Sequence, residues 1–460
     1  MASERKIGLV LAGGGSRGAY EAGVLSVLLP ELERRGQEVT VFVGTSVGAL
    51  SSAFLAGVGP DRSADALTEG ALEVWREIRA DQVFRRPLTQ LPRTVVELAV
   101  PGLRARSLLD AEPLEKTLDK VINFKQLHRN VGRGLIESVS VVATAARDGR
   151  SVVFLDSSAE PPDDDETLRY VPTALANVHV RASAAIPILF PPVEVQMRGV
   201  EGVSGWYYDG GTRLNTPIKP ALDQRVDHVI VIALDSIDAP EARGDGAPPS
   251  FGDAVLHLLD GVLVDPLIDD VRTLARTNRL VEKAAGTVRS PDGKAYRTIP
   301  YIFICPERRG AIGDLAASVF RERYGGWHAL RSPELLTLMY LLGGAGPSQG
   351  ALLSLLFFDQ VFIEGLIEMG ERDALRWIDA ADGDDAPWYE GPLETRPGAL
   401  IPPAAAAPGP RSSGAADDAR DPRASTSSRA RTGASALGPA AAGSRTRRRA
   451  QPRPGPGRTA

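Results

Sequence analysis

Cysteine is nearly absent from this 460-residue sequence, which contains only Cys305. A single cysteine cannot form an internal disulfide, so a secreted scaffold held by disulfides is excluded and a reducing compartment is the simpler expectation. Long apolar runs are also missing near the N-terminus, where Ile7–Ala12 is too short for the core of a signal peptide or for a membrane span. We therefore expect a cytoplasmic protein.

Large apolar residues are almost absent from the C-terminal part, which consists mainly of Ala, Pro, Gly, Ser and Arg. We expect residues 380–460 to be disordered, because such a segment buries too little apolar surface to offset its ordering entropy. Residues 397–460 hold eleven Arg against three Asp, a charge of +8, so the rest of the chain carries −13 of the total of −5. The body is acidic and the tail is basic.

The basic tail has two interpretations. The cluster Arg445, Arg447, Arg448 and Arg449 has the charge to contact anionic lipid or nucleic acid. A solvated arginine-rich tail is the favoured alternative. We expect no nucleic-acid binding and keep peripheral contact with an anionic membrane as the open possibility; any protein partner is unknown.

The remaining composition is that of a soluble globular protein, with 43% hydrophobic and 24% charged residues, and its length allows two or three domains. Residues 6–12 and 39–43 are short apolar runs typical of strands buried on both faces. Between them, residues 19–32 have the density of apolar side chains expected of a helix, with a kink or early end at Pro30. This order predicts parallel strands joined by a helical crossover, and hence an α/β fold.

Further elements follow the same pattern. Residues 139–145 and 151–155 predict a hairpin, and residues 228–234 predict another buried strand. Residues 59–130 predict mostly helices interrupted by prolines, and helices are also expected in residues 251–280 and 333–378.

Two glycine motifs follow the first two predicted strands. Gly13–Gly18 (GGGSRG) lies between the first strand and its helix, and a G-x-S-x-G motif with Gly44, Ser46 and Gly48 follows the second. A nucleophilic serine stands on a tight strand-to-helix turn, which flanking glycines permit. Ser46 is therefore the predicted nucleophile. A second G-x-S-x-G around Ser348 follows glycines and contains Pro347, so we interpret Ser348 as a loop serine.

The first glycine loop has the groups that an acyl-transfer site needs. Attack on an ester creates an oxyanion, and preorganised N–H groups aimed at it are usually the largest catalytic contribution. The carboxyl ends of parallel strands share one edge of the sheet, so the loop is expected to face Ser46. We predict that the N–H groups of Gly14 and Gly15 bind the oxyanion, with Gly13 and Ser16 as further donors. Arg17 is expected to brace this loop rather than to contact a lipid phosphate, since its charge opposes the helix dipole.

A serine nucleophile also needs a base. Asp209 is the best candidate, because Gly210 and Gly211 let the backbone turn sharply after it. An exposed aspartate is a weak base with a pKa of about 3.9, so burial would have to raise its pKa. The alternative for an isolated Asp-Gly-Gly is a plain turn. The five histidines lie in no motif and are expected to be structural or exposed: His128, His179, His228, His257 and His328.

In combination, these motifs resemble the patatin-like phospholipase family, whose members pair a G-G-G-x-R/K-G loop with a G-x-S-x-G elbow and a D-G-A/G aspartate. Gly13–Gly18, Gly44–Gly48 and Asp209–Gly211 match in order and approximate spacing. The segment Ala182–Pro187, which runs on to Phe190-Pro191-Pro192, is also similar to one that these proteins carry shortly before the aspartate.

The resemblance implies a three-layer sandwich with a mostly parallel central sheet flanked by helices. It also implies a lipid acyl hydrolase of phospholipase A or lysophospholipase type that uses a Ser-Asp dyad, without histidine, metal or cofactor, on a lipid ester substrate. The expected domains are a catalytic domain at 5–240, a helical extension at 245–379 and the tail at 380–460. Within the catalytic domain, residues 59–130 are expected to form part of the acyl channel or a lid at an anionic interface. An ordinary amphipathic packing layer is the alternative.

Two other functions compete with this one. The first loop also satisfies the G-x-G-x-x-G pattern of dinucleotide-binding domains, but Gly44-Thr45-Ser46 occupies the place of the acidic residue that would bind the ribose. The second is a catalytically silent binding scaffold of the same fold, against which the intact Ser46 and Asp209 argue.

Overall fold

The computed structural model describes residues 5–59, 62–85, 107, 109–237, 265–284, 288–289, 295–324, 348–381, 387–393 and 396. The chain divides into a compact unit, Met1–Ala405, and a second unit, Ala406–Ala460. All the described residues belong to the first unit, to which the following description is confined.

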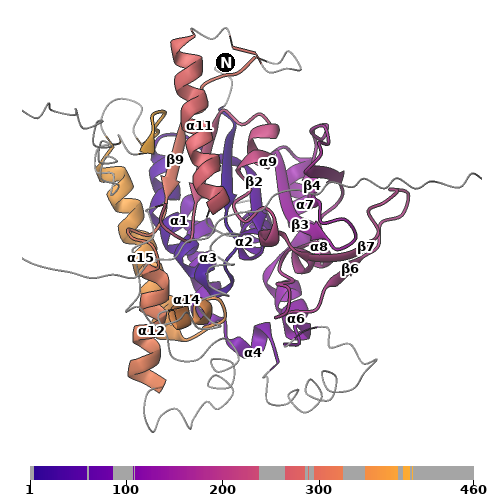
Figure 1. Cartoon of the computed structure of the whole chain (residues 1–460), viewed down its shortest axis with the longest axis vertical. Coiled ribbons are helices and arrows are strands. Elements are labelled where there is room, and N and C mark those ends of the chain that lie inside the picture. The colour runs from indigo at the N-terminus through magenta and orange to yellow at the C-terminus, as the bar shows by residue number, and fades with distance from the viewer. Residues whose placement is uncertain are drawn as a thin grey trace, which may run out of the picture. The chain divides into compact units, whose positions relative to one another are not determined.

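A central sheet of nine strands forms the middle of this unit (Figure 1). Its strands in chain order are β1 (Ile7–Leu11), β2 (Val39–Thr45), β3 (Ser138–Ala145), β4 (Ser151–Ser157), β5 (Leu168–Pro172), β6 (Val193–Val195), β7 (Gly205–Asp209), β8 (His228–Ile232) and β9 (Tyr301–Ile304).

The sheet is mostly parallel. Its order is β5-β4-β3-β2-β1-β8-β9, and the run from β3 to β9 is parallel throughout. β4 is antiparallel to β3, as the predicted hairpin requires. β7 is also antiparallel to β3 and continues the sheet beyond the end of β2, with β6 outside it. The predicted crossover of parallel strands between β1 and β2 is confirmed.

Helices cover both faces of the sheet, since every residue of β1, β8 and β9 is buried (Figure 1). The described helices are α1 (Gly18–Arg34), α2 (Val47–Ala56), α3 (Ala64–Glu77), α4 (Ala80–Val83), α6 (Glu112–Val121), α7 (Phe124–Gly132), α8 (Asn177–Ser183), α9 (Ile218–Asp223), α11 (Asp265–Lys283), α12 (Ala311–Tyr324), α14 (Ser348–Leu353) and α15 (Gln360–Asp379), with short 3-10 turns η1 (Gly15–Arg17) and η2 (Gly210–Thr212). None of them is both long enough and apolar enough to cross a lipid bilayer.

Of the two expectations for Pro30, a kink or an early end of the helix, the early end is wrong. α1 passes through Pro30 and ends at Arg34, and Gly36 then adopts the positive φ of 65° that ends the segment. Burial explains the continuation: Leu28, Leu29 and Leu32, on both sides of Pro30, are packed in the core. Their apolar burial outweighs the one backbone hydrogen bond that proline cannot donate.

The C-terminal region is part of the same core, so the expected boundary near residues 240–245 is not a division between compact units. β9 extends the sheet from β8, and α15 packs along α1. The close approach of these two helices depends on glycines: a Cβ at Gly23 would meet the Ile367 carbonyl, and one at Gly370 would meet the Tyr20 carbonyl. The physical reason is burial, because β9 and α15 cover apolar residues of β8 and α1.

Some residues that the prediction assigns to the tail pack against the body. Beyond residue 380, Tyr389 exchanges backbone hydrogen bonds with Tyr301, and the Arg396 guanidinium lies over the Trp377 ring at 3.1 Å from its centroid. The compact unit accordingly extends to Ala405. The predicted disorder of the rest of the tail concerns residues outside the described ones.

The described parts of residues 59–130 form a packing layer. Trp75, Val83 and Phe84 are buried, as an ordinary amphipathic layer predicts. Residues 86–106 of this range lie outside the described residues, so the lid stays a prediction.

Candidate active site

Ser46 stands on a strained turn between β2 and α2. Its φ of 55° and ψ of −120° place it in a backbone region that non-glycine residues rarely adopt. Flanking glycines allow the turn: a Cβ at Gly44 would collide with the Gly48 carbonyl, and one at Gly48 would collide with the Leu11 carbonyl. The predicted strand-to-helix elbow is therefore present, with Ser46 at its apex.

The register of β3 brings Asp209 to the same point. Along one edge of β3, Thr45 at the end of β2 pairs with Val142, and Asp209 at the end of β7 pairs with the next residue, Ala143. β2 and β7 run in opposite directions along β3, so their ends meet head to head. Ser46 directly follows Thr45, which places the serine and the carboxylate next to each other although 163 positions separate them in the chain.

The Asp209 carboxylate is almost fully buried, with 4% of the residue exposed. Burial raises its pKa to about 7, while the Ser46 side chain and the Gly211 N–H counteract part of this rise. Oδ1 accepts the Gly211 N–H at 2.6 Å, and no described residue donates a hydrogen bond of standard geometry to Oδ2. One carboxylate oxygen is thus held by the turn, and the other has capacity to accept a proton.

The C-terminal end of α8 holds both residues in place. Ser183 Oγ accepts the Ser46 N–H at 2.8 Å and donates to the Val142 carbonyl. Two residues further on, the Ala185 carbonyl accepts the Asp209 N–H at 2.9 Å. This short segment therefore fixes the backbones of the serine and the aspartate together.

The glycine loop lies on the other side of Ser46. Leu11, the last residue of β1, pairs with Gly44, so Gly13 reaches the level of Ser46. A Cβ at Gly13 would lie 3.1 Å from the Ser46 Cβ, which confirms that the loop and the serine are in contact distance. Only a residue without a side chain fits between them.

The hydrogen bonds of the loop narrow the set of oxyanion donors. The Gly13 N–H donates to the Asn215 carbonyl at 3.1 Å, and the Ser16 N–H donates to the Leu355 carbonyl at 3.0 Å. Both amides are therefore engaged, which argues against the expectation that they bind an oxyanion. The N–H groups of Gly14 and Gly15 donate to no acceptor in the described part of the chain and stay the predicted donors.

Arg17 and Gly18 complete the loop. Arg17 Nε donates to Ser354 Oγ at 2.8 Å, and its Nη2 donates to the Ala351 carbonyl at 2.7 Å. Gly18 lets α1 approach α2 and α3, since a Cβ there would collide with Val47 and Trp75. These contacts agree with the expectation that Arg17 braces the loop.

The histidines that the structure describes have structural environments. His179 is buried against Phe154, and burial lowers its pKa to about 4. His228 lies in β8 against Trp388, and His128 pairs with Asp156 at 2.6 Å. His257 and His328 lie outside the described residues.

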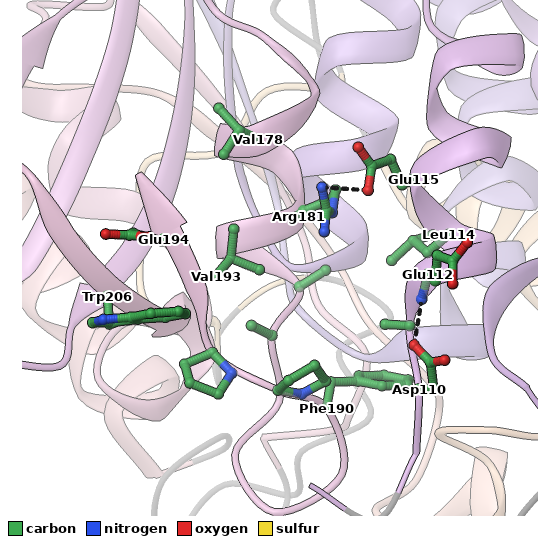
Figure 2. A pocket seen from close by; sticks show the side chains of 15 residues that line it. Asp110, Glu112, Leu114, Glu115, Val178, Arg181, Phe190, Val193, Glu194 and Trp206 are labelled. Carbon is green, nitrogen blue, oxygen red and sulfur yellow. Dashed lines mark hydrogen bonds and ion pairs between the residues drawn. The ribbon is translucent and has the colours of Figure 1, made fainter. Parts of the chain in front are cut away.

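A cavity of about 270 Å³ lies along the side of α8 that points away from Ser46 (Figure 2). Arg181 projects from α8 toward Glu115 of α6 and pairs with it at 2.7 Å. Val178 and Arg181 face this cavity, whereas Ser183 faces Ser46. Trp206 of β7, the strand that ends at Asp209, also lines the cavity, whereas Ser46 does not.

Some positioning groups could not be found from the sequence. Ser183 lies within the segment 182–187 that supports the family resemblance, but no spacing rule predicts its bond to Ser46. Asn215, whose carbonyl binds the glycine loop, belongs to no motif. Ser354 is 337 positions from its partner Arg17, a separation over which local patterns predict no contact.

A serine on a strand-to-helix elbow, a buried carboxylate and a glycine loop are the parts from which serine acyl hydrolases are built. Residues 9–222 match the family described as patatin-like phospholipase. This part of the chain therefore belongs to the patatin-like phospholipase family, and its mostly parallel sheet with flanking helices agrees with the fold expected of it.

The curated relatives are distant. The uncharacterized protein YqhO of Bacillus subtilis (strain 168) is 26% identical over 234 residues, which cover 51% of this chain and 72% of YqhO. The lysophospholipase NTE1 of Candida albicans is 22% identical over 253 residues, or 55% of this chain, but the match spans only 14% of NTE1.

The similar solved structures are distant as well. VipD from Legionella pneumophila has a TM-score of 0.26 at 16% identity, covering 66% of this chain and 61% of VipD. ExoU of Pseudomonas aeruginosa, in its complex with SpcU, has a TM-score of 0.26 at 15% identity, covering 84% of this chain and 73% of ExoU.

Proposed function

We propose that this protein is a serine lipid acyl hydrolase, of phospholipase A or lysophospholipase type, that cleaves fatty acyl esters with Ser46 and Asp209. The observation that carries the proposal is the meeting of β2 and β7 on β3, which sets a strained serine beside a buried carboxylate. Membership of residues 9–222 in a phospholipase family supports lipid esters as the substrate class.

In the first half of the proposed reaction, Asp209 accepts the Ser46 hydroxyl proton as Oγ attacks the acyl carbonyl carbon. The carbonyl oxygen becomes an oxyanion, which the N–H groups of Gly14 and Gly15 stabilise. The tetrahedral intermediate then collapses and the ester C–O bond breaks. The leaving alcohol takes the proton from Asp209, and an acyl-serine remains.

In the second half, water attacks the acyl-serine while Asp209 accepts one of its protons. Collapse of the second tetrahedral intermediate releases the fatty acid and returns the proton to Ser46 Oγ. A base with a pKa of about 7 suits both directions of transfer, because proton-transfer catalysis is most efficient when the pKa is near the working pH.

The experiment is incubation of the full chain with vesicles that contain phospholipid, lysophospholipid and diacylglycerol in water enriched in ¹⁸O. Mass spectrometry should find free fatty acid with one ¹⁸O in its carboxylate, formed by the wild type and not by Ser46→Ala. The lipid class that is consumed identifies the substrate. Absence of released fatty acid from every class would instead favour a silent scaffold.

A further inference from the structure

The glycine loop is held by a segment far along the chain, residues 351–355 at the end of α14. Ser16 donates its N–H to the Leu355 carbonyl at 3.0 Å and its hydroxyl to the Ser354 carbonyl at 2.7 Å. A Cβ at Gly15, which has a φ of 60°, would collide with the same Leu355 carbonyl. The loop and this segment are thus packed backbone to backbone.

Arg17 adds two further bonds to the same segment. Its guanidinium donates to Ser354 Oγ and to the Ala351 carbonyl, while Ser354 Oγ donates to that carbonyl as well. An arginine at the start of a helix is opposed by the helix dipole, so its position needs compensating acceptors. The Ser354 hydroxyl oxygen and the Ala351 carbonyl oxygen are these acceptors.

The segment itself is firmly anchored. Leu353, Leu356 and Phe357 are at most 3% exposed, and Ser354 is fully buried. α14 lies tightly against α12, where Gly350 and Gly313 allow the two backbones to approach. An element fixed in this way can transmit its position to the loop that it touches.

These residues lie outside the part of the chain that matches the family, which ends at residue 222. The family match contains the nucleophile, the aspartate and the glycine loop, but it lacks the acceptors that hold Ser16 and Arg17. The two amides expected to bind the oxyanion, those of Gly14 and Gly15, directly precede these two anchored residues.

We propose that residues 351–355 position the oxyanion loop, with Ser354 acting through Arg17, so that hydrolysis depends on the C-terminal region. This inference rests on the proposed function. Ser354 contacts Arg17 rather than the reacting atoms, so it is a positioning residue. Oxyanion donors act mainly in the transition state, so loosening them should lower kcat while KM changes little.

The kinetic test compares Ser354→Ala with a matched control, Ser318→Ala, whose hydroxyl pairs with Glu322 on α12. On a lipid ester, Ser354→Ala should lower kcat by roughly 10-fold to 100-fold, the scale expected from a misplaced catalytic group. The control should retain the wild-type kcat. Arg17→Ala should lower kcat as well, and the double variant should be no slower than the slower single variant, because both changes remove the same contact.

A second readout does not depend on catalysis. Hydrogen exchange of the peptide that contains residues 12–20 should be faster in Ser354→Ala than in the wild type, with unchanged exchange in β3 and β8. Unchanged exchange in the loop, unchanged kcat, or additive effects in the double variant would each overturn the proposal. If the wild type hydrolyses no lipid ester, the proposed function fails, and the proposed dependence of hydrolysis on residues 351–355 fails with it. The exchange data still show separately whether these residues hold the glycine loop in place.

Discussion

Ser46 and Asp209 are both about 4% exposed, and this burial changes the acid-base properties of the carboxylate. Out of water, the aspartate loses solvation of its charged form, so its pKa rises to about 7. A carboxyl group with that pKa accepts a proton far better than an ordinary surface aspartate does. Its position comes from strand register rather than from a local motif, because Asp209 pairs with Ala143 directly beyond Thr45 and Val142.

The pH dependence of hydrolysis follows from this residue. The folded-state pKa of Asp209 is raised above the ordinary value of 3.8, and the base must be ionised to accept the Ser46 proton. Activity should therefore rise with pH through about 7, and kcat/KM at pH 5 should be roughly 100-fold below its plateau value. The measurement is kcat/KM for a water-soluble short-chain ester across this range. A rise centred near pH 4 would show that the base is not buried in this way.

At the scale of elements, the crossing of α1 and α15 holds the C-terminal region against the body. Gly370 lies where a Cβ would meet the Tyr20 carbonyl, so contact between the helices requires glycine there. Gly370→Ala should destabilise the protein by about 1–3 kcal/mol, the usual cost of overpacking. Urea unfolding measures this change.

The matched control for that variant is Gly132→Ala. Gly132 is the last residue of α7, and nothing lies within 4 Å of a Cβ placed on it. Its substitution should leave stability unchanged or raise it by a few tenths of a kcal/mol, since alanine favours the helix. Equal losses from the two variants would mean that the close crossing has no special role.

Most elements that determine the site could be predicted from local pattern. The apolar runs at β1, β2, β3 and β8 mark buried strands, and glycines mark the turns after two of them. β6 and β7 were not predicted: β6 has three residues, and β7 is a Gly-Trp-Tyr-Tyr-Asp stretch without alternation. β9 is a four-residue run whose place depends on β8, and paired residues of the two strands are 72 positions apart, a distance over which local pattern carries no information.

The same limit applies to the candidate site. Ser46, Asp209 and the glycine loop were found because backbone strain and close approach require glycines beside them, and glycines are visible in the sequence. The engaged amides of Gly13 and Ser16 were not foreseen, because their acceptors, Asn215 and Leu355, come from distant segments. Hydrogen bonds between residues hundreds of positions apart follow from the completed fold alone.

At the scale of the whole molecule, the compact unit is much larger than the family match. It includes β9 in the sheet and α15 on α1, and it extends to Ala405. Charge is divided along the chain: residues 397–460 carry +8 and the remainder carries −13. The body and the tail therefore carry net charges of opposite sign.

This division predicts the behaviour of a chain that ends at residue 405. It should hydrolyse a soluble ester within about twofold of the full chain, because every residue named for the proposed site lies within residues 1–405. If the tail contacts an anionic membrane, cosedimentation should show binding of the full chain, but not of residues 1–405, to phosphatidylserine vesicles at low salt. The difference should disappear near 0.5 M salt through charge screening. Equal binding by both chains would assign any membrane contact to the body.

The most direct test of the central claim, that Ser46 is a nucleophile activated by Asp209, is active-site labelling with a fluorophosphonate followed by peptide mass spectrometry. The two G-x-S-x-G serines provide an internal control. We expect stoichiometric modification of Ser46 in the wild type and in Ser348→Ala, much slower modification in Asp209→Asn, and none in Ser46→Ala. Labelling of another residue, or an equal rate with and without the Asp209 carboxylate, would contradict it.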